Sequence, residues 1–150
     1  MRRALLVLAL VWVPFLSIFG FAAIGDSSHP HIAFHLVAIP LLVGAFVVLR
    51  RLRRDGGRTV RVVAAVLLVT VALAVAGHVA ELAVALARFA QDGFRNRDTA
   101  DLWEHGPHVW ASNLTVPAMM LSMVGSLVLV AAAGLARRRT SDPAPVAVPR

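Results

Sequence analysis

Four long apolar runs alternate with short polar segments along the 150-residue chain. The runs cover about residues 4–24, 32–49, 62–87 and 111–136. Each is close to or above the ~20 residues that an α-helix needs to cross the hydrocarbon of a bilayer. Lipid offers no hydrogen bonds, so a spanning segment must satisfy its own backbone groups, as a helix does. The pattern therefore predicts an all-α integral membrane protein with four transmembrane helices.

The first run has a second interpretation. Arg2 and Arg3 precede it, as basic residues precede the apolar part of a secretory signal peptide. The run is longer than the ~7–15 apolar residues of such a peptide. Its length favours a span that the protein retains.

The connections between the runs indicate how the helices are arranged. Those at 25–31 and 50–61 are short, which favours antiparallel neighbours, so we predict an up-down bundle over residues 1–138. The longer connection at 89–110 has room for a short cap over the end of the bundle. Residues 139–150 are rich in proline and are predicted to form a disordered cytoplasmic tail.

Arginine supplies all fifteen basic residues and clusters beside the apolar runs, which gives a net charge of +7. Twelve of these arginines lie before the first run, in the 50–61 connection or after the fourth run. Such an excess marks the cytoplasmic side of membrane proteins. We therefore expect both termini in the cytoplasm and a multi-pass protein of the cell membrane. A nucleic-acid partner is rejected because the arginines flank spans, whereas a homo-oligomer or a larger membrane complex stays open.

Cysteine and lysine are both absent from the chain. Their absence excludes disulfides, thiolate ligands and thiol nucleophiles, and also Schiff-base chemistry. The polar residues that remain are concentrated on the predicted outer side, which holds six of the eight acidic residues and all six histidines. These histidines are His29, His31, His35, His78, His105 and His108.

Two motifs place ionisable residues on single helix faces. His31 and His35 are four residues apart, and His78 and Glu81 are three residues apart. Residues at these spacings are neighbours on a helix and can bind one ion together. From the ~1.5 Å rise per residue, His35 and His78 lie at similar depths on antiparallel helices. We expect these two to face each other inside the bundle, with His31 and Glu81 one turn further out.

A third motif is the segment WEHGPHVW at 103–110. Glu104 and His108 are four residues apart, and His105 and His108 are three apart. A Gly-Pro pair lies between the two histidines and is expected to interrupt a helix there. The alternative is a surface loop that flanking tryptophans anchor at the level of the lipid headgroups.

Together the three motifs predict a metal site at the extracytoplasmic end of the bundle. Neutral imidazole suits zinc, copper and iron, and paired inward-facing ligands resemble the carboxylate-and-histidine sites of helix bundles. The predicted metal ligands are His31, His35, His78, Glu81, Glu104, His105 and His108. With an open coordination position, a metal-dependent or redox membrane enzyme becomes possible. Without one, the metal is structural, so the sequence leaves open whether the chain is an enzyme.

Two other functions fit the same residues. Histidines on facing helices can be the axial ligands of haem, so His35 and His78 predict haem b and an electron-transfer subunit as an alternative. Glycine and alanine residues near His78 would leave space for the macrocycle. The further alternative is a non-catalytic accessory subunit of a membrane complex, with histidines that sense pH or contact a partner.

Overall fold

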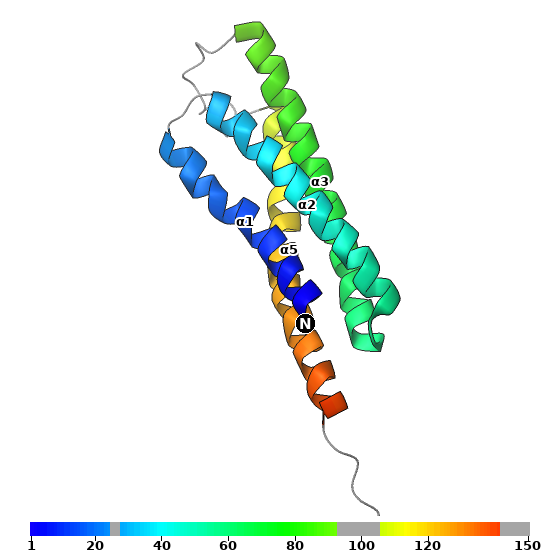
Figure 1. The fold of residues 1–150 in the computed structure, drawn as a ribbon. Coiled ribbons are helices and arrows are strands. Elements are labelled where there is room, and N and C mark those ends of the chain that lie inside the picture. The colour runs from blue at the N-terminus through cyan, green and yellow to red at the C-terminus, as the bar shows by residue number, and fades with distance from the viewer. Residues whose placement is uncertain (25–27, 93–105, 142–150) are drawn as a thin grey trace, which may run out of the picture.

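The computed structural model describes residues 1–24, 28–92 and 106–141. Nearly all of these residues are helical, and they form four long helices: α1 (Arg2–Ile24), α2 (Ser28–Asp55), α3 (Arg58–Asp92) and α5 (Pro107–Ser141) (Figure 1). Each helix contains one predicted apolar run and extends beyond it. All four are long and apolar enough to cross a membrane. The predicted all-α architecture with four such helices is confirmed.

The four helices form a ring. Each packs against its neighbours in the chain, and α1 closes the ring against α5. Only Gly56 and Gly57 separate α2 from α3, so these two helices turn sharply back on each other (Figure 1). The result is the up-down arrangement that short connections favour.

The helices are longer than the apolar runs because polar residues also support helix. Arginine and glutamine are good helix formers, and α3 continues to Asp92 while α5 continues to Ser141. Both helices thus extend into segments predicted as a connection and a tail. Residues 93–105 and 142–150 lie outside the described residues, so the cap and the disordered tail stay predictions.

The centre of the bundle is an apolar core of small and medium-sized side chains. Its buried positions recur at three- and four-residue intervals, as at Val7 and Val11 of α1 or Leu67 and Val71 of α3. This spacing keeps one face of each helix turned toward the core. Large apolar side chains such as Phe19 are instead exposed on the outside of the bundle. Extended apolar surfaces of this kind occur where a protein contacts a membrane or another protein.

Two side-chain contacts join helices in the middle of the bundle. Trp12 Nε1 of α1 donates a hydrogen bond of 3.2 Å to Ser126 Oγ of α5. Ser122 Oγ of α5 lies 2.9 Å from Thr70 Oγ1 of α3, within hydrogen-bond distance. Such bonds between spanning helices contribute about 1 kcal/mol each. They fix α5 relative to α1 and α3, and with it the residues at the start of α5.

The two ends of the bundle carry different polar residues. At one end, Arg3 Nη1 of α1 forms an ion pair of 2.6 Å with Asp55 Oδ2 of α2. Both side chains are more than half exposed, so the pair contributes less than about 1 kcal/mol. This end also holds the arginines of the α2–α3 turn. The buried histidines all lie toward the opposite end.

Candidate metal centre

Three helices each supply part of a buried polar group. His31 and His35 lie one turn apart near the start of α2, and Glu81 lies on α3. His108 stands in the first turn of α5, which begins at Pro107 directly after Gly106. Gly106 has a φ of +86°, which glycine adopts without strain, and proline suits the first position of a helix. The Gly-Pro pair therefore starts a helix and so places His108, where the sequence predicts only an interruption.

Four donor atoms from these residues converge inside the bundle. His31 Nε2 lies 2.9 Å from His108 Nε2 and 3.0 Å from His35 Nε2. The carboxylate oxygen Oε2 of Glu81 lies 3.4 Å from His108 Nε2 and 3.7 Å from His35 Nε2. All four atoms lie within 4.8 Å of one another. The four residues are buried, with exposed fractions from 0% for His35 to 9% for His31.

Hydrogen bonds alone do not satisfy this arrangement. A neutral imidazole nitrogen carries either one N–H or one lone pair, so His31 Nε2 can bond fully with only one of its two neighbouring nitrogens. A metal ion accepts a lone pair from all four atoms at once. Zinc–nitrogen bonds of about 2.0–2.1 Å in a tetrahedron place the ligand atoms roughly 3.3 Å apart. Four of the six separations are 2.9, 3.0, 3.4 and 3.7 Å, on both sides of that value, and all six are within 4.8 Å.

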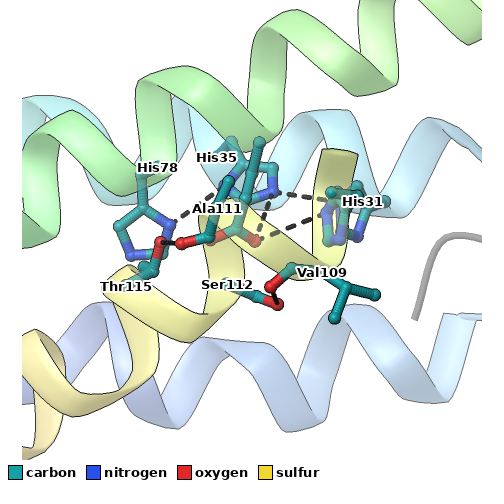
Figure 2. Close-up of polar contacts among 9 residues, drawn as sticks. His31, His35, His78, Val109, Ala111, Ser112 and Thr115 are labelled. Atoms are coloured by element: carbon teal, nitrogen blue, oxygen red, sulfur yellow. Dashed lines mark hydrogen bonds and ion pairs between the residues drawn. The ribbon is translucent and has the colours of Figure 1, made fainter. Parts of the chain in front are cut away.

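His78 lies behind these four residues. Its Nδ1 is 3.0 Å from His35 Nδ1, the ring nitrogen of His35 that is not part of the converging group. Figure 2 shows the rings of His78, His35 and His31 in a row. His35 and His78 therefore face each other, as the sequence predicts, but His78 is not among the four converging residues. A partner on the remote nitrogen orients a metal-binding histidine and fixes its tautomer.

The haem alternative, with His35 and His78 as axial ligands, stays a prediction. The Nδ1 atoms of the two histidines are 3.0 Å apart, which is a hydrogen-bond distance. Gly77, which precedes His78, is required for the packing of two helices. A Cβ added to Gly77 would overlap Thr115 Oγ1 of α5, so the glycine allows α3 and α5 to pack closely.

The remaining predicted residues lie elsewhere. Glu104 and His105 are outside the described residues, so their role as ligands stays a prediction. His29 is exposed, and its ring centroid lies 6.4 Å from that of Phe89. Sequence reasoning does not single out Phe34, whose ring centroid lies 5.2 Å from that of His35 and 5.5 Å from that of His78. Its position directly before His35 is the one signal that could have indicated it.

The chemistry of the group follows from its donors. Three imidazole nitrogens and one carboxylate oxygen, enclosed by three helices, could hold a metal ion. Burying the charge of a divalent cation in an apolar bundle is unfavourable. The negative charge of the carboxylate would offset part of that charge. No family model, curated protein sequence or solved structure matches the chain.

Proposed function

We propose that this chain is a four-span membrane protein that binds one transition-metal ion. The ligands are His31, His35, Glu81 and His108, and His78 orients His35. The observation that carries the proposal is the convergence of four buried donor atoms within 4.8 Å of one another. Ionisable groups inside a membrane bundle are costly, and coordination offsets that cost.

The donor set points to a divalent ion of borderline softness. Imidazole suits zinc, copper and iron, whereas copper(I) prefers sulfur ligands, and none of the four donors is sulfur. Three imidazole nitrogens and one carboxylate oxygen are donors that zinc binds in a tetrahedron, so we propose zinc first. Iron(II) accepts the same donors and would give the site a redox role.

A bound ion would supply Lewis-acid chemistry to an oxygen atom beside it. Glu81 approaches the converging nitrogens through Oε2, and its Oε1 is buried without a hydrogen-bond partner among the described residues. A carboxylate can bind a metal through one oxygen or through both. Four protein ligands fill a tetrahedral site, so a substrate oxygen would bind by expanding the coordination of the ion to five, as a metal-dependent membrane enzyme would require.

Metal analysis of the purified protein tests this proposal. We expect about one zinc or iron ion per chain by elemental analysis, and an absorption spectrum without a Soret band. A Soret band with stoichiometric haem would favour the electron-transfer alternative. Protein that contains neither metal nor haem would contradict the metal centre and favour an accessory subunit.

We also propose that the metal centre lies on the extracytoplasmic side of the cell membrane, because the arginine-rich end is then cytoplasmic. The chain has no cysteine, so single cysteines can report the side directly. Gly57 lies in the α2–α3 turn and Gln91 near the end of α3, and both are exposed. An impermeant maleimide should label Gln91→Cys in intact cells and Gly57→Cys only after permeabilisation. The reverse pattern would contradict this orientation.

A further inference from the structure

An open pocket of about 320 Å³ lies on the flank of the bundle, at the end opposite the candidate metal centre. It is lined by Arg50, Arg53 and Arg54 of α2 and by Leu68 of α3. These two helices run side by side up to their turn (Figure 1). Leu68 is buried, whereas the three arginines are exposed. The pocket therefore combines one buried apolar side chain with three accessible guanidinium groups.

The three arginines of this pocket share one face of α2. Arg53 and Arg54 follow Arg50 by three and four residues, and residues at these spacings are neighbours on a helix. Like charges placed in this way repel each other. Among the described residues of this end, Asp55 is the only acidic one, and it pairs with Arg3. A bound anion would relieve the repulsion in the pocket.

The guanidinium group indicates which anion fits. Its planar array of N–H donors matches two oxygens of one phosphate at once. A cavity of about 150 Å³ accommodates benzene, so about 320 Å³ has room for a phosphate and a small group esterified to it. The pocket thus matches a phosphate ester in both charge and size.

The apolar residues beside the pocket indicate a lipid. Arg50 is the first charged residue after the apolar part of α2. Val47 and Val43 lie one and two turns before it on the same face, and each is 44% exposed. A phospholipid has the same order, with its phosphate directly above its apolar chains. Basic pockets between spanning helices bind anionic head groups in this way.

We propose that this pocket binds the phosphate of one anionic phospholipid, with an acyl chain along Val43 and Val47. The inference goes beyond the metal centre and does not depend on it. It rests only on the part of the proposed function that places the four helices across a bilayer.

Lipid binding to the purified protein tests this inference. The protein in a neutral detergent is titrated with phosphatidylglycerol or with phosphatidylcholine of the same acyl chains, and native mass spectrometry counts the bound lipids. We expect one phosphatidylglycerol per chain, bound at least about tenfold more tightly than phosphatidylcholine. Millimolar inorganic phosphate should not displace it, because free phosphate makes no contact with the valines. Displacement would show a site for a soluble anion and overturn the lipid.

Matched variants separate a site from diffuse surface charge. Arg53→Gln should weaken phosphatidylglycerol binding about fivefold, and the triple variant Arg50→Gln, Arg53→Gln, Arg54→Gln about 100-fold. Arg51→Gln is the control, because it removes the same charge from an exposed position of the same helix that does not line the pocket. It should bind like the wild type. Equal losses for Arg51→Gln and Arg53→Gln would overturn the pocket.

Metal content, measured on the same samples, keeps this inference separate from the proposed metal centre. His35→Ala should lose the metal and still bind phosphatidylglycerol like the wild type. Equal affinity for the two lipids in protein that contains metal would overturn the lipid site alone. A preference for phosphatidylglycerol in protein without metal would support the lipid site and contradict only the metal centre. Protein that stays monodisperse without detergent would contradict the bilayer span and, with it, the lipid site.

Discussion

Replacing His35 with alanine should remove the metal from the protein while the bundle still forms. His35 contributes one of four donor atoms, lies at the centre of the row of histidines and is fully buried. Loss of an outer partner of a metal ligand lowers affinity 10–100-fold, so loss of the ligand itself should lower it by at least about 100-fold. The measurement is competition with a chelator of known affinity, followed by elemental analysis.

His29→Ala is the matched control for this experiment. It removes the same side chain from the same end of α2, but His29 is exposed and not among the converging residues. Its metal affinity should equal that of the wild type. The metal affinity of His78→Ala should lie between those of His35→Ala and His29→Ala. We expect a loss of about 10–100-fold, because His78 contacts the remote ring nitrogen of His35. Unchanged affinity of His35→Ala would show that the metal, if present, is held elsewhere.

Lowering the pH from 7.5 to 4 should release the metal. Each histidine must be neutral to donate a lone pair. A free imidazole takes up a proton below about pH 6.5, and burial beside two other histidines disfavours the charged form, so release should begin below that pH. Protons and the ion therefore compete for three nitrogens. Below that pH, affinity should fall by up to about tenfold per histidine, or roughly 10³-fold, for each pH unit. Metal retained after equilibrium dialysis at each pH measures the effect.

The release of the metal should be reversible, and the helices should stay folded while it occurs. Returning the sample to pH 7.5 with added metal should restore occupancy, and the helical circular dichroism should change little throughout, because the apolar core contains no ionisable residue. His29→Ala should follow the wild-type profile. Occupancy that does not fall at any pH before the helices unfold would contradict histidine ligands.

The sequence predicts the helices well because lipid leaves few alternatives. An apolar run of about 20 residues has to be helical in a bilayer, and the short connection at Gly56 and Gly57 leaves little choice but an antiparallel pair. The facing positions of His35 and His78 were also predictable. They follow from the rise per residue and the direction of the two helices.

The roles of the individual side chains could not be read from the same pattern. Helical spacing places His78 on the right face but does not say which ring nitrogen meets His35, or that His78 stands behind the converging group. His108 depends on the helix start at Pro107 and on how far α5 is rotated about its axis.

The position of His108 on the last helix has a consequence for how the protein matures. His31 and His108 are 77 residues apart in the chain, and a ribosome adds about 5–20 residues per second. The earlier helices therefore wait roughly 4–15 s for the final donor. During this interval only three of the four proposed donors are present. The complete four-donor site can therefore form only after α5 has packed against the other helices.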